Sequence, residues 1–471
     1  MVLGSETQSY ERTLSTSSVV SDRNEEAKKL CEQNGVSLYS CSPPSSGPSA
    51  SLSRAKTTSN PKGTKTLESR SEIRRSSACP MYSGHCSWMR RSESTCTVSI
   101  SGISCAKGRI RSAASLPQLA KSGSKGGQRV NSKSPCLLVA LRPLNVDQER
   151  EKFFKSNFTY NPQFQYEEPF PAAVLTKYSE ASDQFITQAV RIMQAVLAKY
   201  GTYESFEVTN GGSQLSKCQI WNNIRKYMQK EGCAGEIVVH LSEDLLSQAV
   251  MMIENSRPTL TINLSGARQY WLEGMLRHEI GTHYIRGVNN SRQPWHNSDG
   301  RKLFGLKPAN PTEEGLASLH SVLFRKHPFL WRAALLYYTV CSASHMTFCQ
   351  LFKDLEQFVL DPGVRWEYCV RAKRGLTDTT EKGCFSKDQV YLDGILRILR
   401  HRRRIDFQLL AALGKVSYED LERLKDSAVL QSPRIPHFMQ DQNRYQKQLD
   451  HIIVTNHLSD EELAHLLPDG L

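Results

Sequence analysis

"RHEIGTHYIRG", residues 277–287, places two histidines five residues apart, with a glutamate directly after the first. Two histidines four residues apart lie about 40° apart around an α-helix, so both rings can reach one zinc ion. His278 and His283 would instead lie about 140° apart on a regular α-helix. The stretch therefore predicts a zinc site only on a deformed helix. On a regular helix it predicts no zinc site.

A π-bulge removes this conflict, because one extra residue in a turn brings positions i and i+5 to the same face. Such bulges concentrate at functional sites. Gly281 lies between the histidines, and glycine restrains the backbone least. A zinc ion used for hydrolysis needs three protein ligands, an open position for water and a carboxylate that takes the proton of that water. Glu279 stands where this carboxylate is expected.

The segment "NPTEEGLASLH", residues 310–320, offers the third ligand. Pro311 and Thr312 resemble the start of a helix, which places Glu313 and Glu314 in its first turn. One of the two carboxylates can face the histidine helix. The alternative is that both glutamates only interact favourably with the helix dipole.

Charge divides the chain into two regions. Residues 1–135 hold 20 Lys and Arg against 9 Asp and Glu, whereas residues 136–471 hold 40 against 38. The first region is rich in Ser and Thr and lacks hydrophobic periodicity, so we expect a disordered basic tail. It is either a solvated spacer with phosphorylation sites or a tether to an acidic polymer or surface: nucleic acid, an anionic membrane or a microtubule. Residues 136–471 form the second predicted domain.

The chain shows no secretory signal and no apolar run near the roughly 20 residues of a membrane span. Its 13 cysteines are scattered and have no CxxC spacing. These features predict a reduced intracellular protein of the cytoplasm, without a membrane partner.

Hydrophobic periodicity predicts an α+β fold with a small sheet and a mostly helical C-terminal half. An amphipathic helix should end at Gly201. Residues 235–246 indicate a strand followed by a helix with Ser242 as its N-cap. Residues 257–265 alternate as a strand, and from 270 onward most apolar stripes have helical spacing.

Several separated motifs resemble one known family. "HEIGTH" (278–283) is followed by "EEGLA" (313–317), by "RAKRGLTDTTEKGCFSKDQVYLDG" (371–394) and by "LLAALGKVSYEDL" (409–421). In this order they are similar to the microtubule-associated tyrosine carboxypeptidases, which remove the C-terminal tyrosine of α-tubulin. The resemblance covers about residues 150–430.

The resemblance implies a zinc metallopeptidase domain over 136–471 that binds one Zn²⁺ ion. It makes His278, His283 and Glu314 the zinc ligands and Glu279 the catalytic carboxylate. The implied substrate is the acidic C-terminal tail of α-tubulin on microtubules, so the implied location is the cytoplasm and the cytoskeleton. This family shares the five-residue spacing, which favours a bulged zinc helix.

A carboxypeptidase must also hold the terminal carboxylate of its substrate, and a guanidinium group can bind both carboxylate oxygens. The candidates are Arg286, Arg371, Arg374 and Lys387. Tyr391 is a candidate donor to the oxyanion. Each of these side chains has an alternative role as surface charge, structural pair or core residue.

Two further segments are candidates for substrate contact. The strand "TLTINLS", residues 259–265, precedes the zinc helix, and by analogy with other zinc peptidases an edge strand there would align the peptide. Residues 397–406, "RILRHRRRID", are the densest basic patch outside the tail. This patch either meets the acidic substrate or is a solvated helix end.

Other functions remain open at this stage. Within enzymes, the alternative is a zinc peptidase that acts on other C-termini or inside chains. Outside enzymes, it is an inactive scaffold that binds microtubules or nucleic acid and whose zinc site is structural or catalytically dead. A structural site would need four protein ligands, whereas the sequence offers three and a glutamate in the base position. No nucleic-acid-reading module is present, so no nucleic-acid partner is expected.

Overall fold

The computed structural model describes most of the second predicted domain. The predicted basic tail, 1–135, lies outside the described residues, so its disorder and the boundary at 135 stay predictions. The described residues are 141–167, 172–243, 245, 248–254 and 257–468.

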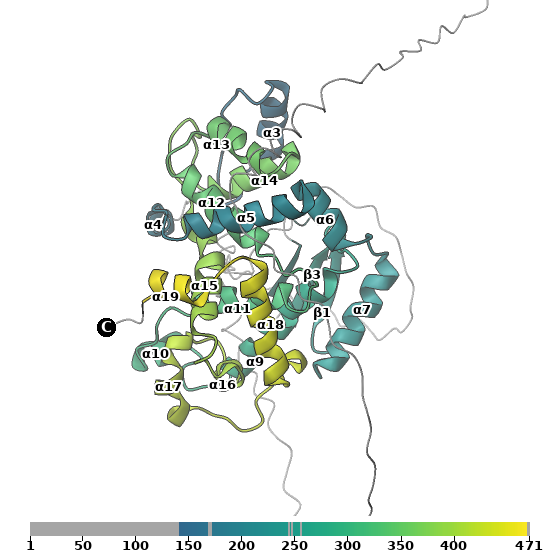
Figure 1. The fold of residues 1–471 in the computed structure, drawn as a ribbon, viewed down its shortest axis with the longest axis vertical. Coiled ribbons are helices and arrows are strands. Elements are labelled where there is room, and N and C mark those ends of the chain that lie inside the picture. Colours follow the sequence, from purple (N-terminus) through teal and green to yellow (C-terminus); the bar gives the residue numbers. More distant parts are fainter. Residues whose placement is uncertain (1–140, 168–171, 244, 246–247, 255–256, 469–471) are drawn as a thin grey trace, which may run out of the picture. The chain divides into compact units, whose positions relative to one another are not determined.

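The described part is mainly helical with one small sheet, as the sequence predicts (Figure 1). Before the sheet, the helices are α3 (Val146–Lys155), α4 (Ala172–Lys177), α5 (Ile186–Tyr200), α6 (Tyr203–Gly211) and α7 (Lys217–Lys230). After it come α8 (Leu272–Leu276), η2 (Arg277–Tyr284), α9 (Ile285–Asn290), α10 (Ser298–Leu303), α11 (Asn310–Val322), α12 (Trp331–Ala343), α13 (Phe348–Asp354), α14 (Pro362–Ala372), α15 (Val390–His401), α16 (Phe407–Ala412), α17 (Leu421–Leu424), α18 (Gln442–Thr455) and α19 (Asp460–Leu466).

The sheet of the described residues has the strand order β1-β3-β2, with β1 (Val238–Ser242), β2 (Ala249–Glu254) and β3 (Arg257–Asn263). β1 pairs with β3 in parallel, and β2 pairs with β3 in antiparallel. The strand predicted over 259–265 is therefore the central strand. The expectation that it is an edge strand open to a substrate peptide was wrong, because both of its edges are occupied.

The helix expected after Ser242 is also absent from the described residues of this segment. The chain instead continues into β2, which the sequence analysis missed. Residues 249–254 read AVMMIE, and Met251 pairs with Leu260 of β3. Both side chains are buried. A short apolar run of this kind does not by itself separate a strand from a buried helix, so pairing with β3 decides the outcome.

Two hydrophobic clusters meet at the segment that carries the histidines. One cluster joins the sheet to α7, α8 and η2, and it includes Ile220, Leu260 and Ile280. The other joins α5, α11, α12 and α15, and it includes Leu335 and Leu396. Figure 1 shows the sheet beside α7, with α11 and α15 nearer the middle of the described part. Ile280 thus places the histidine helix in the first cluster, and α11, which contacts η2, carries Leu316 of the second.

Helices α11 and α15 cross at two glycines. A Cβ atom on Gly394 would collide with the backbone of Pro311, and a Cβ on Gly315 would collide with the backbone of Gly394. The glycines of "EEGLA" and "YLDG" therefore meet each other. This contact sets how close α11, with its two glutamates, comes to the rest of the core.

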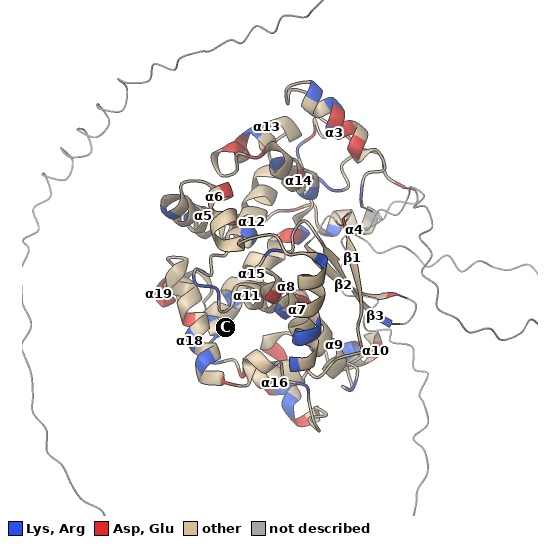
Figure 2. Cartoon of the chain, turned by 90° about the vertical axis from the view of Figure 1, so that its right-hand side faces the viewer, with Lys and Arg blue, Asp and Glu red and all other residues tan. Residues whose placement is uncertain are grey.

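The predicted basic patch, 397–406, is divided between a helix end and internal ion pairs. α15 ends at His401, and α16 begins after Asp406, whose side chain accepts from the backbone N–H of Leu409. Arg402 is buried and its guanidinium group pairs with Asp450 and Asp460 at 2.7 and 2.6 Å. Figure 2 marks acidic and basic residues interspersed along the described helices, for example on α3. Part of the charge of the patch is therefore neutralised within the fold.

Replacing Gly394 with alanine should destabilise the fold, because the new methyl group meets backbone atoms that cannot move away. We expect the free energy of unfolding to fall by about 1–3 kcal/mol, as in other overpacked cores. Gly363→Ala is the control, since a Cβ there meets only the ends of the Asp361 and Arg150 side chains. Urea unfolding measures both variants. Equal stability of the two would contradict the tight crossing.

Candidate active site

The histidines lie on a segment of π-helix. α8, η2 and α9 are continuous, and η2, Arg277–Tyr284, has π-helical geometry. The predicted π-bulge is therefore confirmed. It places the rings of His278 and His283 together, with their centroids 4.9 Å apart and their planes at 78°.

A buried chain of hydrogen bonds holds this π-helix. The hydroxyl of Thr282 donates to the backbone carbonyl of Arg277, five residues earlier, at 2.8 Å. It lies 2.7 Å from Nδ1 of His320, and Nε2 of His320 lies 2.7 Å from the hydroxyl of Tyr445. Because Thr282 uses its proton on the carbonyl, His320 must donate through Nδ1 and accept from Tyr445. α11 and α18 thus support the extra residue of the turn.

Gly281 is needed for space. A Cβ atom at this position would collide with the ring of Phe438 and the hydroxyl of Tyr227. The sequence singled out this glycine for its backbone freedom, but Gly281 has no positive φ in the structure. Its role is to let α7 and the segment before α18 approach the π-helix closely.

His278, His283 and Glu314 form a group that fits a metal ion. Their candidate ligand atoms all lie within 4.8 Å of one another. Nε2 of His283 and both carboxylate oxygens of Glu314 are buried and have no hydrogen-bond partner among the described residues. Buried polar atoms are nearly always paired, so orphaned acceptors that converge on one point suggest a missing cation. Two imidazoles and a carboxylate are a ligand set that suits zinc.

The electrostatics of this group favour a bound cation. Burial, together with the neighbouring charge of His283, holds the pKa of His278 well below its usual value, so this ring stays neutral, as a metal ligand must. Burial also opposes the charged form of His283, but its hydrogen bond to Glu313 and the charge of Glu314 raise its pKa overall. The carboxylates around His283 thus favour positive charge at this place.

Glu279 lies beside this group and is almost fully buried. Its carboxylate accepts a hydrogen bond from the backbone N–H of Met251 in β2, and its Oε2 atom is unpartnered. Burial raises the pKa of Glu279 to about 7, and the charge of Glu314 acts in the same direction. A carboxylate with such a pKa can both take and return a proton near neutral pH.

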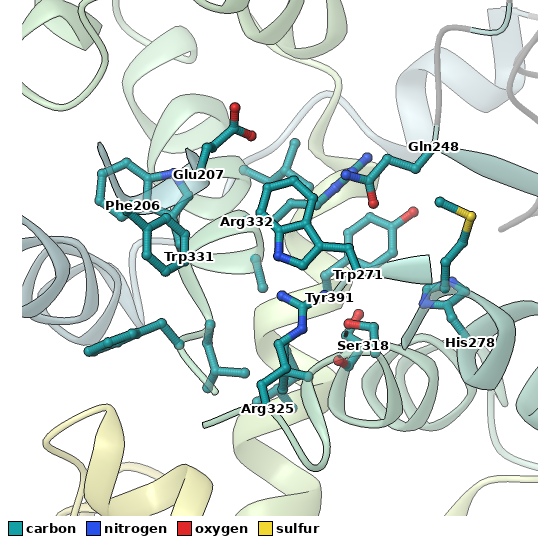
Figure 3. A pocket seen from close by; sticks show the side chains of 18 of the residues that line it. Phe206, Glu207, Gln248, Trp271, His278, Ser318, Arg325, Trp331, Arg332 and Tyr391 are labelled. Atoms are coloured by element: carbon teal, nitrogen blue, oxygen red, sulfur yellow. Dashed lines mark hydrogen bonds between the residues drawn. The ribbon is translucent and has the colours of Figure 1, made fainter. Parts of the chain in front are cut away.

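A pocket opens beside His278 and Glu279. Its walls come from α6, β2, α8, η2, α11, α12, α14 and α15. Aromatic side chains line much of it, and Figure 3 shows Trp271, Trp331 and Phe206 among them. Of the predicted substrate-binding residues, Arg371 and Tyr391 line this pocket.

The other three predicted substrate-binding residues do not line it. Arg286 is buried, and its guanidinium group binds the Glu313 carboxylate at 2.7 Å and the carbonyls of residues 410 and 416. Arg374 and Lys387 are buried near Asp388, and the charges of both lower the pKa of Asp388 despite its burial. All three side chains are therefore buried within the fold, outside the pocket.

Arg332 is the pocket residue that the sequence analysis missed. It lies in the first turn of α12, its side chain is exposed, and it forms no hydrogen bond or ion pair with any described residue. Figure 3 shows it next to Trp271 and Gln248. A cation in the first turn of an apolar helix opposes the helix dipole. That local conflict in "WRAALL" is the signal that could have identified it.

None of the helices in the described ranges is long and apolar enough to cross a membrane.

The comparison with known proteins identifies the family. The family model described as "Microtubule-associated tyrosine carboxypeptidase" matches residues 178–457, which include the histidines, both glutamates of α11 and Arg332. The chain belongs to this family.

Three relatives show how far the similarity extends. Microtubule-associated tyrosine carboxypeptidase 1 of Mus musculus is 69% identical over 394 residues, which cover 81% of this chain and 84% of the relative. The Homo sapiens protein of the same name is 66% identical over 404 residues, covering 83% and 86%. A protein named putative tyrosine carboxypeptidase MATCAP2, from Mus musculus, is 62% identical over 351 residues, covering 74% and 67%.

His320 should make the fold sensitive to acid. Burial and the nearby charges of Arg277 and Arg286 lower the pKa of His320 to about 3. The unfolded chain takes up a proton on this ring below about pH 6.5, but the folded protein does not, so stability falls as the pH falls through this range. We expect His320 to account for about 2 kcal/mol of the loss between pH 7 and pH 5.

The measurement is urea unfolding of the wild type and His320→Gln at both pH values, with a chelator present so that metal binding does not contribute. The variant should be less stable at pH 7 but lose less between pH 7 and pH 5. An equal loss in the two proteins would show that His320 does not stay neutral in the fold.

Proposed function

We propose that this protein is a zinc-dependent carboxypeptidase that removes the C-terminal tyrosine of α-tubulin on microtubules in the cytoplasm. The observation that carries the proposal is the convergence of His278, His283 and Glu314 beside Glu279, at the mouth of an aromatic pocket with an unpaired arginine. The names of the relatives supply the class of reaction and the tyrosine.

The donor set supports a catalytic metal site. Among the described residues, three ligands converge, and a carboxylate stands beside them in place of a fourth. A structural zinc site would have four protein ligands. In the bound state Zn²⁺ would act as a Lewis acid, which allows a water molecule to lose its proton near neutral pH.

Glu279 moves the proton in this mechanism. Its unpartnered Oε2 atom can accept the proton of the attacking water, while the N–H of Met251 holds the carboxylate in place. Glu279 then passes the proton to the amine of the departing tyrosine, which is the usual role of a positioned carboxylate in peptide hydrolysis. Tyr391, on α15, lines the same pocket and is the candidate donor to the oxyanion.

Arg332 would bind the terminal carboxylate of the substrate. The guanidinium group is unpaired in the fold, so it keeps its donors for a ligand, and a planar fork matches a carboxylate. Arg371 contributes a second positive charge to the pocket wall, although Asp388 already pairs with it at 2.8 Å. Trp271 supplies an aromatic surface against which a tyrosine ring can pack.

In this proposal the edge strand β2, and not residues 259–265, aligns the substrate peptide. It contacts η2, and Gln248 and Ala249 line the pocket. A peptide laid along this side of the sheet would run towards Glu279 and end in the pocket.

The test is to incubate purified microtubules with the protein, with and without a chelator, and to measure the α-tubulin C-terminus by mass spectrometry. Loss of one tyrosine only without the chelator supports the proposal. Loss of other terminal residues, or cuts inside the chain, would instead show a peptidase of different specificity. Binding to microtubules without any cleavage would show an inactive scaffold.

Glu279→Gln should keep the fold and the bound zinc but abolish cleavage, because the amide preserves the shape of the side chain and cannot take a proton. His278→Ala, His283→Ala and Glu314→Ala should each lower zinc occupancy as well as activity. Metal analysis beside a cleavage assay separates the two effects. Full turnover by Glu279→Gln would exclude Glu279 as the base.

Arg332→Ala should remove the preference for a free C-terminus. The wild type should cleave a peptide that ends in tyrosine carboxylate far better than the same peptide ending in tyrosine amide. In the variant, kcat/KM for the free acid should fall about 30- to 5,000-fold, the equivalent of the 2–5 kcal/mol lost when one partner is removed from a charge pair that the bound substrate buries. The amide should be affected much less.

Arg225→Ala on α7, an exposed arginine away from the pocket, is the matched control for the loss of one positive charge. It should retain the preference for the free acid. If Arg332→Ala also retains it, the carboxylate is bound elsewhere, and Arg371 is the next residue to vary.

A further inference from the structure

The two adjacent glutamates of α11 have different surroundings. Glu314 presents two unpartnered oxygens to the histidines. Glu313, also buried, has both oxygens engaged: Oε1 lies 2.9 Å from Nδ1 of His283, and Oε2 lies 2.7 Å from Nε of Arg286. Nζ of Lys415 lies 3.3 Å from Oε1. A purely structural role for Glu313 would need only the contacts to Arg286 and Lys415. The remaining contact is to His283, which belongs to the metal group.

The contact between Glu313 and His283 determines what the imidazole can do. Nδ1 donates its proton to the carboxylate, so the lone pair is on Nε2. Nε2 is the unpartnered atom, and it lies 3.9 Å from Oε2 of Glu314. The hydrogen bond therefore selects the tautomer that can bind a cation and fixes the orientation of the ring.

Two cations lie against the buried carboxylate of Glu313. Nε of Arg286 lies 2.7 Å from Oε2, and Nζ of Lys415 lies 3.3 Å from Oε1. A carboxylate is a strong acceptor for a histidine N–H, and it raises the basicity of the histidine that donates to it.

We propose that Glu313 is a positioning residue that orients His283 for metal binding, with Arg286 and Lys415 holding Glu313 in place. This inference rests on the proposed zinc site. It concerns the affinity of that site for its metal, whichever peptide the protein cleaves.

The segment 410–417 is part of the same unit. The guanidinium group of Arg286 donates to the carbonyls of Leu410 and Val416 at 2.8 and 3.1 Å. The backbone N–H of Lys415 donates to the side chain of Asn290 at 3.2 Å. The motif "LLAALGKVSYEDL", which contains no residue of the metal group, thus supports the site by holding the partners of Glu313.

The experiment compares zinc affinity in three proteins by competition with a chromogenic chelator at one pH. Glu313→Gln should bind zinc about 10- to 100-fold more weakly than the wild type, the range found when the partner of a metal-bound histidine is replaced. Glu231→Gln is the matched control, because Glu231 also pairs with a histidine, His437, at 2.8 Å, but outside the metal group. It should lower thermal stability and leave zinc affinity unchanged.

A second readout reports geometry. Cobalt(II) in place of zinc gives visible absorption bands that depend on the arrangement of the ligands. These bands should shift in Glu313→Gln and stay unchanged in Glu231→Gln. If Glu313→Gln does not fold, Lys415→Met provides the test, since it weakens the hold on Glu313 without leaving His283 unpaired. It should weaken zinc binding in the same direction by a smaller factor.

The outcomes separate this inference from the proposed function. A wild type that binds neither zinc nor cobalt would refute the metal site itself. A wild type that binds zinc, together with Glu313→Gln of equal affinity and unchanged cobalt spectrum, would refute only the positioning role. Glu313 would then be a structural partner of Arg286.

Discussion

The candidate site depends on one extra residue in one helical turn. A regular α-helix would hold His278 and His283 on different sides, and no side-chain rotation would bring both rings to one ion. The π-helix carries an intrinsic cost, since this geometry is rare and is found mostly as single turns at functional sites. Here the hydroxyl of Thr282 donates to the carbonyl of Arg277 and accepts from Nδ1 of His320, whose Nε2 atom accepts in turn from the hydroxyl of Tyr445. Supporting helices thus stabilise a local geometry that the segment alone would not favour.

Close packing supplies the rest of the geometry. Glu314 reaches the histidines because α11 approaches η2 on one side and crosses α15 at paired glycines on the other. Glycine in a helix costs up to about 1 kcal/mol relative to alanine. The close crossing that these glycines allow places the candidate ligand atoms of Glu314 and the two histidines within 4.8 Å of one another. The motif "EEGLA" therefore combines a proposed ligand, a partner of a proposed ligand and a packing contact within five residues.

The sequence predicted the parts of the site that follow from local spacing. The π-bulge, the start of α11 and the grouping of His278, His283 and Glu314 all follow from periodicity, capping preferences and the family motifs. The sequence did not predict that β3 lies in the middle of the sheet. Strand order depends on pairing with β2, and the short apolar run of β2 fits either a strand or a buried helix. From the sequence, Arg286 was a candidate for binding the terminal carboxylate of a substrate, because it follows the histidine helix directly. Its partners at residues 313, 410 and 416 are distant in sequence, and only the folded chain shows that each of its three nitrogen atoms donates to one of them.

Three neighbouring carboxylates show how the fold separates roles that the sequence leaves alike. Glu313 is ionised because Arg286 and Lys415 lie against it, so it serves as a fixed acceptor for His283. Glu314 has no such partners, and its free oxygens face the histidines. Glu279 is held by one backbone N–H and has its pKa raised to about 7 by burial, which suits proton transfer. Charged partners, their absence and desolvation thus suit the three carboxylates to the proposed roles of positioning group, ligand and base. Because Arg286 and Lys415 lie against Glu313, Glu314 is the glutamate of this pair whose oxygens are free for a cation.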